Sequence, residues 1–142
     1  MLAALCLAKE TREGTRMIGE RMWKICKAIY PLDIWNDDEK KQGYMHPALV
    51  FAIVCYHLEI PKETTVLSYL YTSVQVLVQN AIRAIPLGQT DGQRLLVSIR
   101  PHLLKAVQKI DTLTEEELGA VAPGLEIAQM QHEQLSVRLF MS

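Results

Sequence analysis

Apolar residues recur every three or four positions along most of this chain, in segments that proline residues separate. One such stripe runs through residues 18–29 and is followed by Pro31, and Pro61 precedes a longer stripe over residues 67–85. This spacing places apolar side chains on one face of an α-helix, and proline stops a helix because it has no N–H to donate. The pattern predicts an all-α fold for residues 1–142, as a single-domain helical bundle of about five to seven helices.

The first two helices differ in how much apolar surface they present. Residues 47–58, which begin just after His46, are apolar on nearly every side, so this helix is expected at the centre of the bundle. The helix over residues 18–29 has one apolar stripe, which is expected to face the core. The members of that stripe are Ile18, Met22, Ile25, Cys26 and Ile29.

The long segment after Pro61 carries two conflicting patterns. Residues 72–79, TSVQVLVQ, alternate with a period of two and are rich in β-branched residues, as in a strand. The helical stripe around them is far longer, so we expect a helix that Pro86 ends. Its inward residues are expected to be Leu67, Leu70, Val74, Leu77, Ala81 and Ile85.

The carboxy-terminal third is expected to contain shorter helices. Pro101 lies inside an apolar stripe, which predicts a kink or break near Ser98. Thr114 and Glu117 have the spacing of a capping box before a short helix that ends at Gly119, and a final helix should follow. Inward positions after Pro101 are Leu103, Leu104, Val107 and Ile110, and those of the final helix are Ile127, Met130 and Leu135.

The turn IPLGQTDGQRLL, residues 85–96, is the one glycine-rich stretch that could bind a ligand. It lacks the Gly-Lys-Ser/Thr of a phosphate loop and no strand precedes it. We interpret it as a corner between helices, in which Gly88 adopts a left-handed conformation and Thr90 caps the next helix through the Gln93 N–H. This interpretation leaves Gln89, Asp91 and Arg94 without a role.

Composition argues against several classes of protein. The chain carries 15 Lys and Arg against 16 Asp and Glu, a net charge of −1, so nucleic acid is not an expected partner. Its three cysteines are far apart and form no CxxC pair, which argues against disulfides and structural zinc and suits the cytoplasm. No apolar run is long enough to span a membrane, and none reads as a signal peptide.

No catalytic constellation is visible. The four histidines fall on different expected helices, and Cys55 and His57 point to different faces of one helix. His132-Glu133 begins like a zinc-protease motif, but Ser136 stands where the second histidine must be. We therefore expect no metal site, no cofactor and no enzymatic activity, and a hydrogen-bonding role for the isolated histidines.

Several stretches together resemble the UreF family of urease accessory proteins. They are AIRAIPLGQTDGQRLL, the terminal EIAQMQHEQLSVRLFMS and, upstream, AKETREGTRMIGERM and HPALVFAIVCYHLEIP, in the order and spacing of that family. The leading segment with Gly, Ser and His that family members carry has no counterpart here, so the chain is expected to be an amino-terminally truncated UreF-like domain.

The resemblance implies an adaptor in urease maturation. UreF-like proteins join a UreD- or UreH-type accessory protein and the UreG GTPase on urease apoprotein, where nickel is inserted. Two alternatives stay open, a regulator that supplies Arg94 or Arg138 to the GTPase and a metal-binding chaperone. The family also assembles around dimers, so a homodimer or higher oligomer is expected.

Three groups of residues are candidates for partner binding. The first group lies on the long helix, which has aromatic and basic residues and Val78 outside its apolar stripe. The second group is the three polar residues of the corner that have no other role. The third group is the tail, which combines apolar residues with Arg138. Asp91 and Arg94 could instead simply pair with each other, and the tail could fold back on the bundle. The full candidate set is Tyr69, Tyr71, Arg83, Gln89, Asp91, Arg94, His132, Glu133, Arg138, Leu139, Phe140 and Met141.

Overall fold

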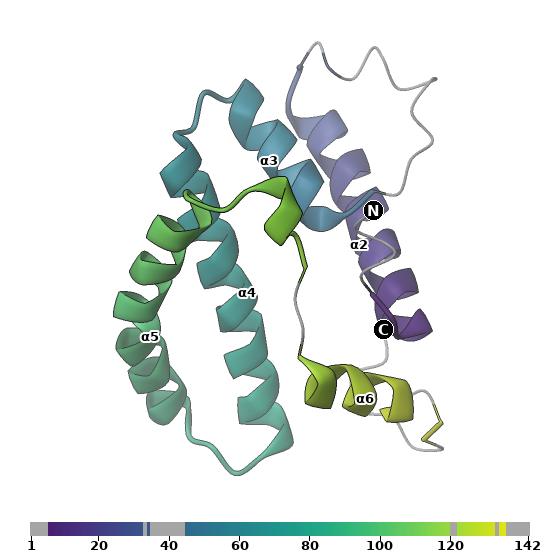
Figure 1. Ribbon diagram of the computed structural model, residues 1–142, viewed down its shortest axis with the longest axis vertical. Helices are drawn as coiled ribbons and strands as arrows, with labels where there is room; N and C mark the ends of the chain where they lie inside the picture. The colour runs from purple at the N-terminus through teal and green to yellow at the C-terminus, as the bar shows by residue number, and fades with distance from the viewer. Residues whose placement is uncertain (1–5, 33, 35–44, 120–121, 133, 136–142) are drawn as a thin grey trace. The chain divides into compact units, whose positions relative to one another are not determined.

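The computed structural model describes residues 6–32, 34, 45–119, 122–132 and 134–135, and in these the regular structure is helical, without strands. The all-α prediction is confirmed. Two compact units are present, one of residues 1–54 with 119–142 and one of residues 55–118. In chain order the elements are α2 (Lys9–Ile29), α3 (Pro47–His57), α4 (Lys62–Ala84), α5 (Gln89–Ile110), the 3-10 helix η2 (Glu115–Glu117) and α6 (Pro123–His132) (Figure 1).

Prolines set several helix boundaries, as expected. Helix α2 ends two residues before Pro31, and α4 ends at Ala84, after which Ile85 is extended (φ −128°, ψ 157°) ahead of Pro86. A residue before proline avoids the α conformation because of a clash with the proline ring. Pro61 directly precedes α4 with an extended ψ of 140°. The TSVQVLVQ stretch lies within α4, so the choice of helix over strand is confirmed.

Pro101 does not break its helix. Helix α5 includes Pro101 and continues uninterrupted to Ile110, so of the two expected outcomes, a kink or a break near Ser98, the break does not occur. Pro101 is exposed and costs one backbone hydrogen bond, to the Val97 carbonyl. Leu96 and Leu103, on either side of it, are both buried, and this shared apolar face keeps the helix together.

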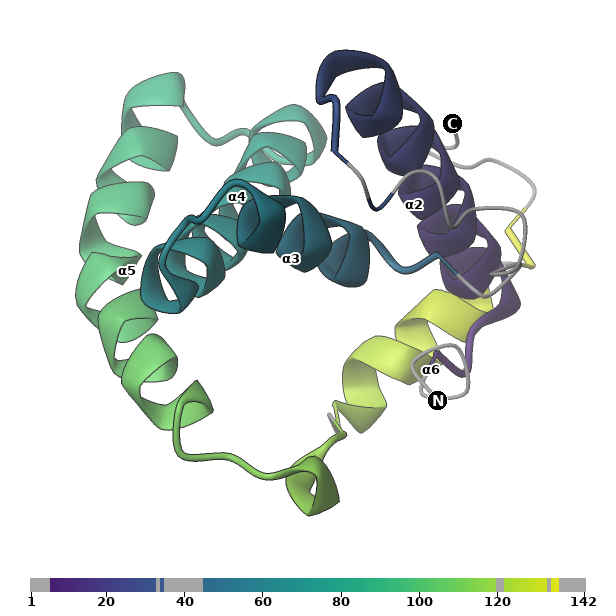
Figure 2. The ribbon, with the colours of Figure 1, turned by 90° about the horizontal axis from the view of Figure 1, so that it is seen from above.

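The first unit is built around α2. Cys26 of α2 and Val54 of α3 form a buried cluster, against which Met22 and Trp23 pack. Gly19, one turn earlier, is buried directly under the Met45 carbonyl, so the chain entering α3 crosses α2 with no room for a side chain. Helix α6 packs beside α2 (Figure 2).

The expected inward stripe of α2 is only partly correct. Cys26 is buried, but Ile18, Ile25 and Ile29 are 60%, 51% and 63% exposed. The buried face instead follows Gly19, Met22, Trp23 and Cys26, because Gly19 is where the segment before α3 comes closest. The expected stripe thus shares Met22 and Cys26 with the buried face, whereas its three isoleucines lie outside that face.

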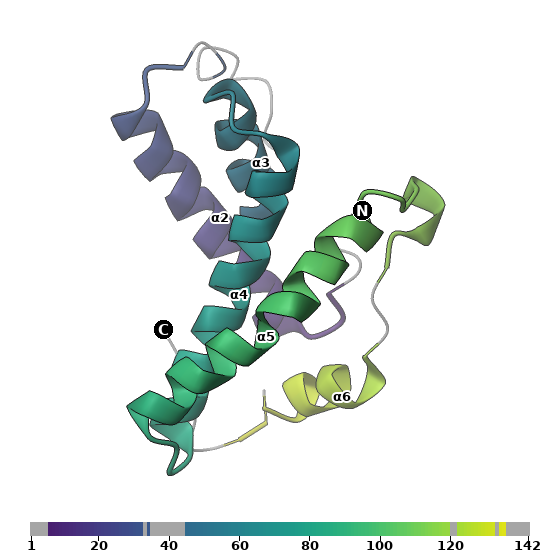
Figure 3. The same cartoon turned by 90° about the vertical axis from the view of Figure 1, so that its left-hand side faces the viewer.

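The second unit is a helical hairpin of α4 and α5, which lie side by side (Figures 1 and 3). Gly92 is buried against Val78 and Ile82 of α4, and a methyl group in its place would overlap the end of the Ile82 side chain. Small residues at such points let two helices approach closely. Leu96, Leu103 and Val107 continue the buried face of α5.

Some inward assignments in the hairpin are wrong. Leu77 of α4 is 68% exposed, Ile85, which directly follows α4, is 55% exposed, and Leu104 of α5 is 50% exposed. Val78, expected at an interface, is 5% exposed and belongs to the core instead. The face of α4 that meets Gly92 decides this, because burial follows the closest approach of the two helices.

Helix α3 is buried on one side only. Val50 and Val54 are 0% and 6% exposed, whereas Leu49 and Tyr56 are 47% and 79% exposed, so the expectation of burial all round is not met. The helix ends with Glu59 in the left-handed region, at φ 56°.

Two backbone hydrogen bonds close this end of α3. The Glu59 N–H donates to the Tyr56 carbonyl at 3.0 Å, and the Ile60 N–H to the Cys55 carbonyl at 2.9 Å. These are the two bonds of a Schellman motif, with glutamate where glycine is usual.

The expected capping box at Thr114 is half formed. The Glu117 carboxylate accepts the Thr114 N–H at 3.0 Å, but the helix that follows is the three-residue η2 rather than a longer α-helix. Gly119 follows it with a positive φ of 155°.

Candidate docking surfaces

The amino-terminal end of α5 contains the corner singled out in the sequence. Gly88 is its cap residue, with φ −70° and ψ 152°, so it is extended rather than left-handed. Thr90 lies inside the helix, and the cap makes no side-chain hydrogen bond, so the Thr90–Gln93 capping box is wrong. The Gly88 carbonyl accepts the Gly92 N–H at 3.0 Å, which starts the helix before Thr90 and leaves Thr90 no capping position.

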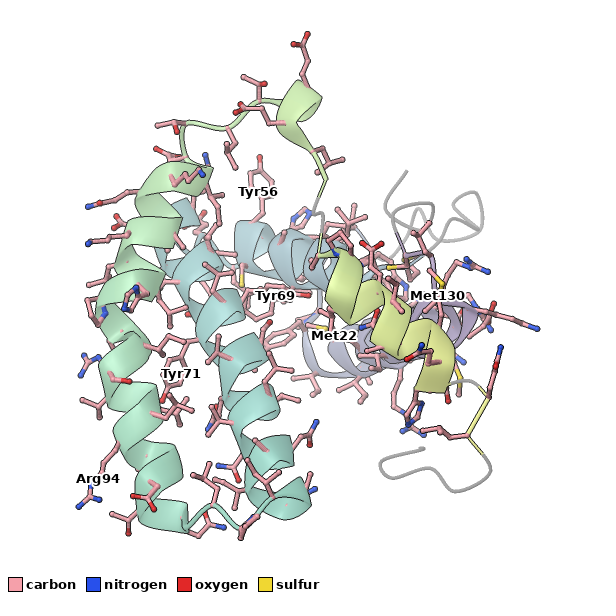
Figure 4. All side chains as sticks on the ribbon, turned by 60° about the horizontal axis from the view of Figure 1, so that its bottom comes forward. Met22, Tyr56, Tyr69, Tyr71, Arg94 and Met130 are labelled. Atoms are coloured by element: carbon pink, nitrogen blue, oxygen red, sulfur yellow. The ribbon has the colours of Figure 1, made fainter. Side chains whose placement is uncertain are left out.

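Two of the corner's polar residues pair with each other. Arg94 Nη1 donates to Asp91 Oδ1 at 3.0 Å, and the two side chains are 77% and 54% exposed. Asp91 also lies in the first turn of α5, where the helix dipole favours a carboxylate. An exposed pair of this kind contributes little to stability, and it is the local pairing that the sequence offered as the alternative to partner binding. Arg94 extends away from α5 (Figure 4), and Gln89, the first residue of this helix, is exposed.

The candidates on α4 do not share one face. Tyr71 lies on the side of α4 toward α5, and Tyr69 lies on the opposite side (Figure 4). Tyr69 is half-buried, which raises the pKa of its phenol, because burial disfavours the charged form. Arg83 is exposed in the last turn of the helix. These three residues are therefore separate features rather than one patch.

A groove of about 450 Å³ runs along the hairpin where Tyr71 meets α5. Sequence reasoning missed it, because a groove depends on how two helices cross and not on either stripe alone. We call it the α4–α5 groove. Its lining residues are Leu67, Ser68, Tyr71, Gln93, Leu96, Val97, Arg100, Leu103 and Leu104.

His132 connects the last described helix to the first. Its Nδ1 lies 3.1 Å from Glu10 Oε2 of α2, with the side chains 37% and 33% exposed. The expected hydrogen-bonding role of this histidine is confirmed. The other tail candidates, Glu133, Arg138, Leu139, Phe140 and Met141, lie outside the described residues.

A second histidine has a structural role that the sequence did not reveal. The Ala48 N–H donates to His46 Nδ1 at 3.1 Å, so the imidazole caps the start of α3. Burial lowers the pKa of His46. The signal was present as histidine directly before Pro47, since proline favours the first position of a helix.

Metal and membrane features are absent from the part of the chain that the structure describes. No three His, Cys, Asp or Glu side chains there lie close enough to hold a metal ion. Cys26 and Cys55 are buried and Cys6 is partly exposed, and none of these three described cysteines forms a disulfide. None of the described helices has the length and apolar character that a bilayer span requires.

Comparison with known proteins gives a consistent result. Residues 1–100 match the model of the UreF family. A urease accessory protein UreF of Geobacillus kaustophilus (strain HTA426) is 63% identical over 141 residues, which cover 99% of this chain and 63% of that protein. Proteins of the same name from Bacillus sp. (strain TB-90) and Lachnoclostridium phytofermentans are 54% and 49% identical, over the whole of this chain and 64% of each relative. The chain thus spans a little under two thirds of the length of these relatives.

Proposed function

This chain belongs to the UreF family, and we propose that it acts in urease maturation as a cytoplasmic, non-catalytic adaptor. In this role it joins a UreD- or UreH-type accessory protein and the UreG GTPase, and the assembly delivers nickel to urease apoprotein. The name that its relatives carry, urease accessory protein, supports the first step of this proposal. Binding of the accessory protein and of the GTPase would require particular surfaces of this chain, and the experiments proposed for those surfaces follow.

The observation that carries the adaptor role is the amount of exposed apolar surface. Nine hydrophobic residues are buried among the described residues, whereas 22 large ones are exposed. Scattered exposed apolar residues are ordinary, but sets on single helix faces favour protein partners. Ile18, Ile25 and Ile29 of α2 form one such set.

The tail is the proposed docking element for an accessory protein. Leu139, Phe140 and Met141 are consecutive apolar residues, and Arg138 beside them offers a planar set of donors for carboxylates or carbonyl groups. Apolar side chains next to an arginine are a combination that is favoured in protein interfaces.

Two variants test the tail. Deletion of residues 135–142 and the substitution Arg138→Ala should each abolish or weaken capture of the purified accessory protein or of the GTPase, while the thermal transition of the chain stays near that of the unchanged protein. Arg21→Ala, which removes another exposed arginine, from α2, is the matched control and should capture normally. A deletion that unfolds the chain, together with normal capture by Arg138→Ala, would mean that the tail is structural.

Two measurements separate the adaptor from its alternatives. GTP hydrolysis by UreG should be unchanged by this chain if it is an adaptor, and accelerated if Arg94 or Arg138 acts as a catalytic arginine. Calorimetric titration of the isolated chain with nickel should give no sub-micromolar site, whereas a metal-binding chaperone would show one.

The exposed apolar faces also lead us to expect self-association. Sedimentation at tens of micromolar should show a dimer or larger oligomer.

A further inference from the structure

The α4–α5 groove has a buried apolar floor and exposed apolar walls. Leu96 and Leu103 form the floor and are 3% and 7% exposed. Val97 and Leu104 of α5 and Tyr71 of α4 form the walls and are 64%, 50% and 38% exposed. Wall residues so exposed give the groove an apolar surface that a ligand could cover.

The length of the groove suits one short helix. Its α5 side extends from Gln93 to Leu104, which at about 1.5 Å per residue corresponds to roughly 16 Å, or three helical turns. A groove between two helices accepts the apolar face of a third in many protein complexes, with anchors spaced three and four residues apart.

The hairpin is basic although the chain is not. Residues 62–111, which include the C-cap of α5, contain six Lys and Arg and three Asp and Glu, whereas the whole chain has a net charge of −1. Two of these cations already have partners, Lys62 with Asp111 and Arg94 with Asp91. Arg100, which lines the groove, is exposed and makes no ion pair among the described residues.

These charges distinguish between possible occupants. A second copy of the hairpin would bring like charges together across a two-fold axis, which is unfavourable. Nucleic acid needs a dense set of cations toward its phosphates, whereas this groove presents mainly aliphatic walls and one arginine. A helix with an apolar stripe flanked by carboxylates satisfies both the apolar walls and Arg100.

We propose that the α4–α5 groove is a docking site for an acidic amphipathic helix of a partner protein. Its apolar stripe lies against Tyr71, Val97 and Leu104, and a carboxylate pairs with Arg100. An arginine–carboxylate contact is frequently bidentate, so Arg100 fixes the register of the bound helix as well as adding affinity. This inference concerns a different surface from the tail and does not rest on the proposed role in urease maturation.

The test uses the purified full chain and two synthetic peptides labelled with fluorescein. Both peptides are about four helical turns long and have leucines spaced three and four residues apart; one carries glutamate at the flanking positions and the other lysine. Fluorescence anisotropy should show that the acidic peptide binds at least about tenfold more tightly than the basic one. Added salt should weaken its binding, because the charged part of the contact is exposed.

Substitutions locate the binding. Arg100→Glu and, separately, Val97→Asp should each reduce affinity for the acidic peptide by about tenfold or more, and Arg100→Gln by a smaller factor. Lys109→Glu makes the same charge change on α5 outside the groove and should have less than about a threefold effect. All three positions are exposed, and circular dichroism melts of each of the four variants verify that the helices are intact.

Several results would overturn the proposal. They are equal binding of the two peptides, affinity that Arg100→Glu leaves unchanged, tighter binding of a short DNA duplex that displaces the peptide, and self-association that Val97→Asp abolishes. Because no urease component takes part, these outcomes leave the adaptor proposal to its own test.

Discussion

Gly19 of α2 lies directly beneath the backbone carbonyl of Met45, in contact too close for any side chain. The contact joins α2 to the chain that enters α3, and it involves backbone on the Met45 side, which cannot rotate away as a side chain can. This one position therefore limits how closely α2 and the start of α3 can approach each other.

Substitution of Gly19 should be strongly destabilising. Gly19→Ala places a methyl group against the Met45 carbonyl and should lower the free energy of unfolding by about 2 kcal/mol or more, measured by urea denaturation. Gly14→Ala is the matched control on the same helix, since a methyl group there meets nothing within 4 Å. It should stabilise by up to about 1 kcal/mol through helix propensity. Equal effects of the two substitutions would contradict the close approach.

Gly92 should tolerate a methyl group only when its neighbour becomes smaller. In Gly92→Ala the new methyl group overlaps the end of the Ile82 side chain, so a cost of about 1 kcal/mol is expected despite better helix propensity. Combined with Ile82→Val, which removes the overlapping methyl group, the loss should be smaller than the sum of the two single effects. A double-mutant cycle from thermal melts measures this, and strict additivity would show that the two residues do not touch.

Replacement of Glu59 by glycine should increase the stability of the folded chain. The φ of Glu59, 56°, is in the left-handed region, which costs an L-residue about 1 kcal/mol and glycine almost nothing. Glu59→Gly should therefore raise the melting temperature by a few degrees, and Glu59→Asn by less. Glu59→Ala, which keeps the strain and removes only the charge, provides the comparison and should give no increase.

The cap at His46 should make stability depend on pH. Its Nδ1 accepts the Ala48 N–H only when it carries no proton, and burial lowers the pKa of the folded-state imidazole below the ordinary value of 6.5. The unfolded chain therefore binds this proton more readily, so the contribution is complete above about pH 6.5 and is lost as the pH falls toward the lower folded-state pKa.

Substitution tests this assignment. His46→Asn retains a capping group that does not titrate near neutral pH, and it should reduce the loss of thermal stability between pH 8 and pH 5. His46→Ala should be less stable by about 1 kcal/mol at pH 8. An exposed histidine, His102, gives the control: His102→Asn should leave the pH dependence in place. An unchanged slope in His46→Asn would show that the cap is not responsible.

The helical character and most helix boundaries of this chain were determined by the sequence. Pro31 and Pro86 end helices through their own covalent structure, which needs no partner and so acts in any fold. The length of the apolar stripe in α4 outweighed its short β-like alternation, because packing along a whole helix face outweighs local propensity.

Choices between equivalent local possibilities needed the tertiary structure. The sequence indicated a single apolar stripe on α2, and the contact of Gly19 with Met45 places the buried face beside it, along Gly19, Met22, Trp23 and Cys26. Thr90 has the spacing of a capping residue, but α5 begins before it, with the hydrogen bond to the Gly88 carbonyl. Helix α5 also continues past Pro101, because its buried face packs on α4 on both sides of that residue. The groove beside Arg100 forms because α4 and α5 come close together at Gly92. Each helix can be predicted from its own sequence pattern, but the groove between them cannot. Such features depend on contacts between residues distant in the chain, and local patterns do not contain that information.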